Sequence, residues 1–501
     1  MSLEQLIKVN THYTRSVNIE RDKDSLASIN AYIPTSRAIR TLARVADVSH
    51  ADAAPRAWSL VGPYGSGKSA FALFLSQLLA ADGKEGHKAA LKVLNKADKN
   101  LGQRFSRHIK GGEGYIKVLV TGSPEPMGRR IVQAVAEAAA EVWSSRKGKK
   151  PAVIADLERA GAAKDVANSD VVKLVKRLQV QIAKIGGNGL LLVIDELGKF
   201  LEFEARHYGA NDIFLLQSLA ELACEGHEAN LMLFVLLHQS FEQYAKGLGE
   251  SLKNEWSKVQ GRFEEVPFLE SSEQVLRVVS AAFEQDFDAK HKAAVKKAVS
   301  PIVKMLHETK ALPAAMTLKD AEALFMQCYP LHPVSALLLP MLCQKIAQNE
   351  RTLFSYLGSH EDHGFQSELK SLNEPGDFVL PSQVFDYFVT NQSSVMGDYL
   401  THRRWAEVIT ALDRLEDVNE EQVGLLKTIG ILNIIGSRAG FKASIEILTS
   451  VMPSQAAFTR ATKALKAQSV INFRRFSGEY RVWQGSDFDL EAALEEELQN
   501  L

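Results

Sequence analysis

The chain has 501 residues, of which 46% are hydrophobic and 24% are charged, and its formal net charge is −1. This composition is ordinary for a globular protein, and the length is sufficient for roughly two to four domains. A near-neutral charge excludes a surface that is basic all over, so any contact with nucleic acid must come from a local patch.

The cysteines and the hydropathy pattern bear on the compartment. Cys224, Cys328 and Cys343 show neither disulfide nor zinc-ligand spacing, which favours a reducing environment. No signal peptide is recognisable, and no apolar run is long enough to cross a bilayer. We therefore expect a cytoplasmic protein that is not inserted in a membrane.

A phosphate-binding motif follows the N-terminal segment, residues 1–50, in which Thr35 or Ser36 is expected to cap a helix. Ala57–Val61 predicts a buried strand and Ala70–Leu79 a helix, and the residues between them fit the pattern G-x-x-x-x-G-K-[ST]. Glycines in such a loop let backbone N–H groups point at phosphate oxygens, the lysine reaches the β- and γ-phosphates, and the hydroxyl binds Mg²⁺. The predicted nucleotide-binding residues are Gly62, Pro63, Tyr64, Gly65, Ser66, Gly67, Lys68, Ser69 and Ala70.

A second motif begins at residue 190, where a continuous apolar run ends in Asp195 and Glu196. Such a run is typical of a central parallel strand that is covered on both faces. Asp195 is placed to hold Mg²⁺ together with Ser69, and Glu196 to orient and deprotonate a water molecule. The alternative is an acid pair that caps the helix predicted from Leu197 onward.

Strands and helices alternate through the central part of the chain. Strands are predicted at Tyr115–Thr121, 190–194 and Leu231–Leu237, with helices between them, and this order favours a parallel sheet. The last of these strands ends at His238 and Gln239. Ser271–Leu357 is almost wholly helical in pattern, and the polar stretch from His360 to Pro381 is interpreted as a linker.

The C-terminal part predicts three helices followed by a hairpin that turns at Ser477-Gly478, which is a winged-helix arrangement. Basic residues on the third helix and on the hairpin are candidates for contact with DNA phosphates, although winged helices also dock proteins. These candidates are Arg460, Lys463, Arg474, Arg475 and Arg481.

Taken together, these motifs resemble those of the AAA+ ATPases, nearest to the origin-recognition-like branch with a C-terminal winged helix. The resemblance implies that Glu196 marks an active hydrolase and that His238 or Gln239 senses the γ-phosphate. It also implies that Arg262, in Gly261-Arg262-Phe263, reaches the active site of a neighbouring subunit, so that the protein forms a homo-oligomer. Arg351 lies where a second arginine of the helical lid contacts nucleotide in such proteins.

More narrowly, three short segments are similar to ATPases of prokaryotic phage-defence systems of the BREX type. They are Tyr329–Pro333, Gln348–Phe354 and Tyr480–Asp487. This similarity implies an antiviral role and protein partners in a defence complex.

The sequence thus predicts an α/β P-loop NTPase core with a helical lid and a winged helix, using ATP and Mg²⁺. The expected domains are residues 1–50, 51–270 (core), 271–358 (lid), 359–418 (connection) and 419–501 (winged helix). The leading hypothesis is an ATPase that couples nucleotide state to remodelling on DNA. The alternatives are a STAND-like nucleotide switch that recruits an effector and a DNA-binding regulator that ATP modulates.

Overall fold

The computed structural model describes most of the chain, in two compact units. One unit spans Ser16–Glu270, and the other combines Met1–Arg15 with Ser271–Leu501. The described residues are 3–10, 17–49, 54–63, 65–109, 111–206, 212–244, 250–269, 271–313, 316–346, 353–358, 360–391, 399–417, 419–436 and 440–483.

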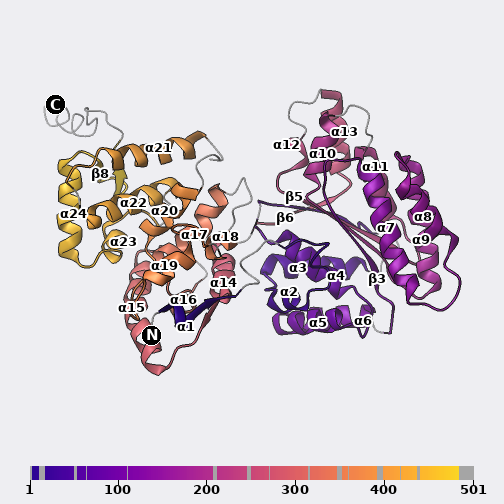
Figure 1. The fold of residues 1–501 in the computed structure, drawn as a ribbon, viewed down its shortest axis with the longest axis horizontal. Coiled ribbons are helices and arrows are strands. Elements are labelled where there is room, and N and C mark those ends of the chain that lie inside the picture. Colours follow the sequence, from indigo (N-terminus) through magenta and orange to yellow (C-terminus); the bar gives the residue numbers. More distant parts are fainter. Residues whose placement is uncertain are drawn as a thin grey trace. The chain divides into compact units, whose positions relative to one another are not determined.

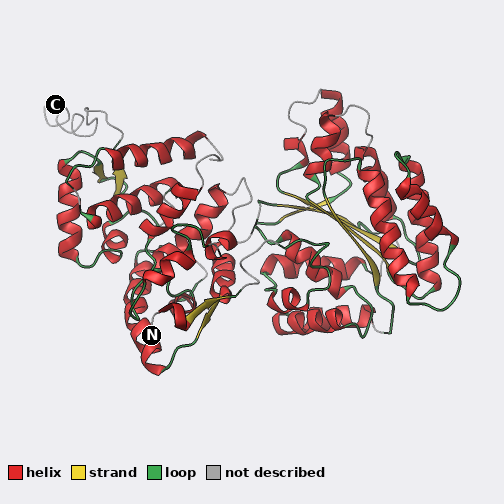
Figure 2. Ribbon diagram, in the orientation of Figure 1, coloured by secondary structure: helices red, strands yellow, loops and turns green. Residues whose placement is uncertain are grey.

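The unit that spans residues 16–270 is built on a five-stranded sheet in which all neighbouring strands are parallel (Figures 1 and 2). The strand order is β3-β4-β5-β2-β6. The strands are β2 (Ala57–Val61), β3 (Tyr115–Thr121), β4 (Gly189–Asp195), β5 (Asn230–Leu237) and β6 (Glu264–Pro267). Strand β5 therefore separates β2 from β4.

Helices cover both faces of this sheet because alternate strand residues point to opposite sides. Along β4, Leu190 and Leu192 pack in one cluster with α7, α9 and α11, whereas Leu191 and Val193 pack in another with α3 and α4 (Figure 1). The helices are α2 (Leu26–Ala31), α3 (Ser36–Val48), α4 (Lys68–Leu78), α5 (Glu85–Ala97), α6 (Lys99–Ile109), α7 (Met127–Ser144), α8 (Ala152–Ala162), α9 (Asn168–Lys184), α10 (Gly198–Arg206), α11 (Asp212–Cys224), α12 (Phe241–Tyr244) and α13 (Glu250–Gln260).

The other unit is mainly helical, and its N-terminal strand pairs with a strand from much later in the chain. β1 (Ile7–Val9) lies antiparallel to β7 (Phe283–Gln285). The second pair is a hairpin of β8 (Ile471–Arg474) and β9 (Glu479–Val482). The helices are α1 (Leu3–Leu6), α14 (Ser272–Ala282), α15 (Ala289–Glu308), α16 (Leu318–Gln327), α17 (Pro333–Ile346), α18 (Leu353–Gly358), α19 (Phe365–Ser371), α20 (Pro381–Asn391), α21 (Tyr399–Asp413), α22 (Glu420–Ile435), α23 (Ile445–Ser450) and α24 (Gln455–Ala467).

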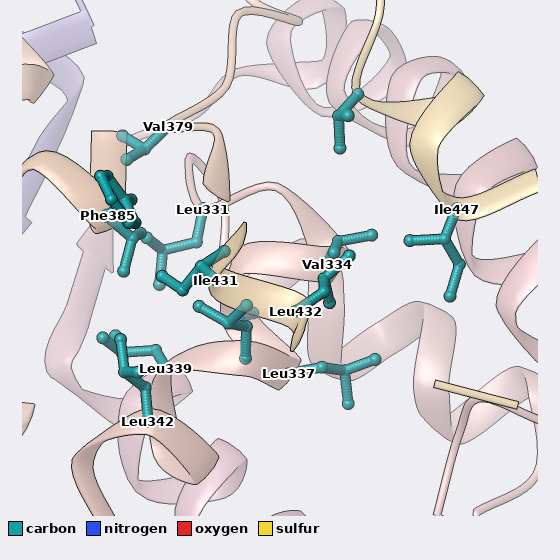
Figure 3. Packing of buried hydrophobic residues seen from close by; sticks show 14 of the residues in the cluster. Leu331, Val334, Leu337, Leu339, Leu342, Val379, Phe385, Ile431, Leu432 and Ile447 are labelled. Atoms are coloured by element: carbon teal, nitrogen blue, oxygen red, sulfur yellow. The ribbon is translucent and has the colours of Figure 1, made fainter. Parts of the chain in front are cut away.

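A single apolar cluster runs through this mainly helical unit (Figure 3). Leu337 and Leu342 of α17 belong to it together with Phe385 of α20 and Ile431 of α22. Helix α22 lies inside this cluster, and all its residues from Ile429 to Ile435 are buried. A capping box formed by Asn419 and Gln422 provides hydrogen-bond acceptors for backbone N–H groups in the exposed first turn of this otherwise apolar helix.

Most predicted elements are confirmed, often to the residue. The strands at 57–61 and 115–121 have the expected bounds, and the side chain of Thr35 caps α3 as expected. The C-terminal order of three helices and a hairpin is also present, with a turn that ends at Gly478 in a left-handed conformation (φ 61°).

The stretch Ser271–Leu357 is almost wholly helical, as expected, and its one described strand is β7, whose partner is the N-terminal strand. One expectation about the mainly helical unit needs correction. Residues 360–381 are not a bare linker, because they form α19 and place Phe365 and Leu369 in the core. Two apolar residues among many polar ones are sufficient to bury one face of a short helix.

Among the described residues, no helix combines the length and the apolar character needed to cross a membrane.

The buried ring of His332 should make the stability of the mainly helical unit depend on pH. Its Nδ1 accepts a hydrogen bond from Val334 N (3.2 Å), and Nε2 bonds Ser450 O (3.0 Å), which defines a neutral tautomer. Burial lowers the pKa of His332 to about 4, with the bond to Ser450 opposing the shift. Since His332 is protonated more readily in the unfolded chain, its contribution to stability should be fully present above about pH 6.5. The free energy of unfolding should then fall by about 3 kcal/mol toward pH 4.

Urea unfolding at several pH values measures this effect. His332→Asn should flatten the loss between pH 6.5 and 4, whereas the same change at the exposed His307 should keep the wild-type slope. A wild-type slope in the His332 variant would contradict the assignment.

Candidate functional site

The carboxyl ends of parallel strands meet at one edge of the sheet, and three strands carry polar residues there. Strand β2 leads into the glycine-rich loop, β4 ends in Asp195, and β5 ends before His238. Because β5 is hydrogen-bonded to both β2 and β4, it fixes their ends relative to each other. This edge is the candidate functional site.

The loop at residues 62–67 has the backbone that its glycines permit. Gly65 (φ 73°) and Gly67 (φ 89°) are left-handed, and Gly67 is the N-cap residue of α4. Gly62 N donates to Leu237 O (3.0 Å), and a Cβ on Gly62 would lie 2.4 Å from Phe268 O. The loop is therefore fixed between β5 and the chain that follows β6. The predicted contact Tyr64 lies outside the described residues.

Lys68 is the first residue of α4 and is only 8% exposed. Its Nζ donates to Gly62 O (2.6 Å), Pro63 O (2.9 Å) and Ser66 Oγ (3.3 Å). Burial lowers the pKa of Lys68 to about 8, although Asp195 and Glu196 favour its charged form. The ammonium group is thus held inside the loop, within electrostatic range of both acids.

The two sequence motifs meet at Ser69 and Asp195, because the Ser69 hydroxyl is near enough to the Asp195 carboxylate to lower its pKa. Asp195 is 7% exposed, and burial raises the pKa of its carboxyl group, while the nearby Ser69 hydroxyl opposes the shift. A buried carboxylate of this kind is stable only with donors or cations around it. The structure therefore brings together the two residues that the sequence proposed as metal ligands.

Glu196 has an unusual backbone for a residue other than glycine, with φ 52°. Its N–H donates to Asp195 Oδ1 (2.9 Å), and its carboxylate pairs with Lys199 (2.5 Å) while remaining partly exposed. Left-handed backbone costs about 1–3 kcal/mol in such residues and concentrates at functional sites. The Glu196 side chain is 33% exposed, whereas Asp195 stays buried.

Of the two candidates at the end of β5, His238 has the better-defined environment. The Tyr244 hydroxyl lies 2.8 Å from its Nδ1. Burial lowers the pKa of His238 and the nearby Lys68 lowers it further. His238 thus lies in electrostatic range of the loop. Gln239 is half-buried at the next position.

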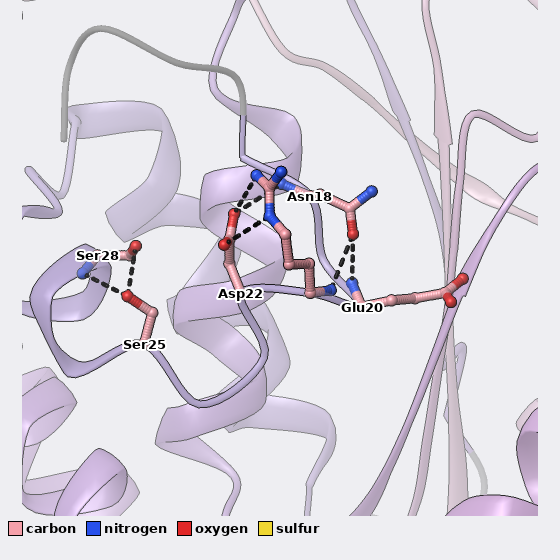
Figure 4. A network of polar contacts seen from close by, with 6 residues as sticks. Asn18, Glu20, Asp22, Ser25 and Ser28 are labelled. Atoms are coloured by element: carbon pink, nitrogen blue, oxygen red, sulfur yellow. Dashed lines mark hydrogen bonds and ion pairs between the residues drawn. The ribbon is translucent and has the colours of Figure 1, made fainter. Parts of the chain in front are cut away.

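A compact turn near the N-terminus of this unit supports the end of β3, and sequence analysis missed it. The Asn18 side chain accepts from the N–H groups of Glu20 and Arg21, and Arg21 pairs with Asp22 (Figure 4). The Glu20 carboxylate in turn accepts from Thr121 N and pairs with Arg130 (2.7 Å). Only the cluster of charges in residues 18–22 hinted at this role.

Arg262 lies away from this edge. It precedes β6, and β6 runs parallel to β2, so it is at the amino edge of the sheet, opposite the loop. There it pairs with Glu221 (3.3 Å), and both side chains are about half exposed. Arg262 is therefore not part of the site formed by its own loop.

The remaining predicted residues belong to the other unit or are not described. Arg351 lies outside the described residues. Arg460 and Lys463 lie on α24, and Arg460 is 3.7 Å from Glu421. Arg474 is on β8, Arg481 is on β9, and Arg475 is in the turn between them.

These features define the class of the fold. A helix-covered parallel sheet, with a glycine-rich loop after β2, an acid pair after β4 and β5 between them, is the α/β P-loop NTPase fold in its AAA+ form.

No family model matches the chain, and no curated protein is significantly similar to it. Solved structures with some likeness include the Aeropyrum pernix ORC2 protein with ADPNP and ADP (13% identity, TM-score 0.36, 99% of this chain and 98% of that chain covered). Its ADP form has 11% identity and TM-score 0.32 over 94% and 93% of the chains. Cdc6p from Pyrobaculum aerophilum has 10% identity and TM-score 0.33 over 99% of both. Because these scores are low, the fold assignment rests on the sheet and loop of this chain.

Gly122 offers a test of how tightly the acid turn is packed. It follows β3, donates from its N–H to Asp195 O (2.8 Å), and a Cβ there would lie 2.1 Å from Glu196 O. Gly122→Ala should therefore destabilise this unit by about 1–3 kcal/mol in urea unfolding. Gly424→Ala is the control, since its Cβ would meet nothing closer than 3.8 Å, and equal effects of the two changes would contradict the packing.

Proposed function

We propose that this protein binds and hydrolyses ATP. The observation that carries the proposal is the meeting of Lys68 and Ser69 with the acids Asp195 and Glu196, which lie within electrostatic range of one another. Two motifs that are distant in sequence thus form one polar site at the edge where P-loop proteins bind phosphates.

The loop residues would bind the triphosphate. The helix α4 begins at Lys68, so its N-terminal N–H groups and its dipole favour an anion in the loop. The Lys68 ammonium now donates to two backbone carbonyls, and phosphate oxygens would be stronger, charged acceptors for the same group. Gly62, Pro63, Tyr64, Gly65, Ser66, Gly67, Ser69 and Ala70 complete the proposed nucleotide-binding set.

The donor set of Ser69 and Asp195 fits a magnesium ion. A hydroxyl and a carboxylate are hard oxygen ligands of the kind that Mg²⁺ prefers, and the buried Asp195 carboxylate requires a positive partner. When bound, Mg²⁺ would supply neutralisation of the phosphate charge.

Glu196 is the proposed catalytic base. Its carboxylate is partly exposed beside the buried Asp195, so it can accept a proton from water while Asp195 remains with the metal. Gln239 is proposed to contact the γ-phosphate, and His238 to position it. Arg351 of the helical region is proposed as a further nucleotide contact.

Arg262 is proposed to act in the site of a second subunit. Its place at the edge opposite its own loop makes a role in the same subunit inconsistent with the sheet geometry. A guanidinium that stabilises transition-state charge from outside implies a homo-oligomer.

The C-terminal helices and hairpin support a further proposal, that ATP turnover is coupled to DNA through a winged helix. Arg460 and Lys463 on α24 are the proposed contacts with the DNA backbone, with Arg474, Arg475 and Arg481 on the hairpin. A role in a prokaryotic defence complex with protein partners remains a hypothesis based on three short segments of sequence.

Replacement of the base separates binding from turnover. Glu196→Gln should lower the ATPase rate by about 10²-fold or more while ATP still binds, because only the proton acceptor is lost. Lys68→Ala should abolish both. ATPase assays with and without duplex DNA, combined with calorimetric binding of ATP, measure these effects.

Glu225→Gln is a matched control, because this exposed carboxylate precedes β5 at the opposite edge of the sheet. Turnover by Glu196→Gln at the wild-type rate would remove Glu196 from the role of base. Failure of the wild-type protein to bind ATP would refute the proposed function.

A mixing experiment tests whether subunits share sites. Lys68→Ala and Arg262→Ala proteins should each be inactive alone, since one lacks the phosphate contact and the other lacks the arginine given to the neighbour. Their mixture should regain a fraction of the activity, because some interfaces then join an intact loop to an intact arginine. Glu221→Ala removes only the partner of Arg262 and is the control.

A mixture that stays inactive while Arg262→Ala alone is also inactive would contradict a shared site and would mean that the change acts on the fold of its own subunit. Full activity of Arg262→Ala would exclude a shared site.

A further inference from the structure

The mainly helical unit contains a pocket of about 290 Å³ between α21, α22 and the β8–β9 hairpin. Helix α21 contributes Arg404 and Glu407, and the hairpin contributes Arg474 and Arg481. Trp483, which follows β9, completes one side. No residue of the proposed ATP site is part of it.

The hairpin arginines are directed into this pocket by the alternation of strand residues. Phe473 and Tyr480 are paired across the hairpin, and Lys466 of α24 lies over both rings, 5.9 Å and 5.2 Å from their centroids. The neighbouring residues Arg474 and Arg481 therefore project from the opposite face of the hairpin. Hence Arg474 and Arg481 lie on the hairpin face opposite the one that Lys466 covers.

The pocket has excess positive charge. Arg481 pairs with Glu479 (2.7 Å), and Glu407 pairs with Arg403 (3.0 Å). Arg404 is half-buried and donates to Asn433 O (2.7 Å), a neutral acceptor. Within the described part of the chain, neither Arg404 nor Arg474 has a carboxylate at ion-pair distance. Two guanidinium groups are thus available to an anion.

The other residues that line the pocket favour a ligand that carries a ring or polar groups in addition to an anionic group. Asn433 is not available to a ligand, because it donates to Tyr480 O and accepts from Val482 N (both 3.0 Å), which holds α22 against β9. Asn472 adds an amide, and Trp483 adds a half-buried indole. An indole beside guanidinium groups matches a ligand that joins a planar ring to a phosphate.

We propose that this pocket binds a nucleotide monophosphate unit, with the phosphate at Arg404 and Arg474 and the base against Trp483. The volume is near the lower end for small-ligand sites and suits one nucleotide rather than a duplex. The unit is either a free nucleotide or the end of a single strand, and both present the same chemistry.

Calorimetric titration of the full-length Lys68→Ala protein tests the site without a contribution from the glycine-rich loop. The probes are AMP, short oligothymidylate with and without a 5′-phosphate, and inorganic phosphate. AMP or the phosphorylated strand should bind, and Arg404→Ala/Arg474→Ala should weaken binding by about tenfold or more. Arg414→Ala, at an exposed position just after α21, removes the same charge and should have no effect.

Because Arg404 also donates a hydrogen bond to α22, its replacement could lower stability, so Arg474→Ala alone is the second variant. Arg474 is exposed, and its replacement should weaken binding without changing the unfolding curve. Binding of AMP identifies a free nucleotide, and binding of only the phosphorylated strand identifies a strand end. The proposal is overturned if neither probe binds, if binding survives the double variant, or if inorganic phosphate binds as tightly as AMP.

Discussion

The approach of Ser69 and Lys68 to Asp195 depends on the order of strands in the sheet. Ser69 lies on α4, which follows β2 through the glycine-rich loop, and Asp195 ends β4. Strands β2 and β4 are not neighbours in the sheet, and β5 is hydrogen-bonded to both. The buried Asp195 carboxylate and the buried Lys68 ammonium each need the other motif to reduce the cost of losing water. A change that shifted β5 by one residue would therefore separate the loop from the acids, although both motifs would remain in the sequence.

The core of the site could be predicted from sequence because its signals are local. The glycine-rich loop needs residues with left-handed backbone, and Gly65 and Gly67 adopt it. A buried strand needs a continuous apolar run, and β4 has one. The left-handed Glu196 and the Glu20 support of β3 could not be predicted. Both depend on contacts between segments that are distant in the chain, and periodicity does not record such contacts.

The mainly helical unit shows the same limit. The C-terminal order of three helices and a hairpin could be predicted because local signals, such as the Ser454 cap and the apolar spacing of α24, encode the helices. The strand β7 was missed because three residues at the end of a helix carry too weak a pattern. The basic hairpin residues were recognised by type, but their direction was not, since it depends on which hairpin face carries Phe473 and Tyr480.

The pairing of β1 with β7 has a consequence for how the protein is made on the ribosome. Strand β1 is synthesised before the unit that spans residues 16–270, whereas β7 follows the whole of that unit. At translation rates of about 5–20 residues per second, β1 waits for tens of seconds before its partner exists. The sheet-containing unit can therefore fold in that interval, and a nascent chain interrupted before β7 would present an unpaired strand to chaperones and proteases.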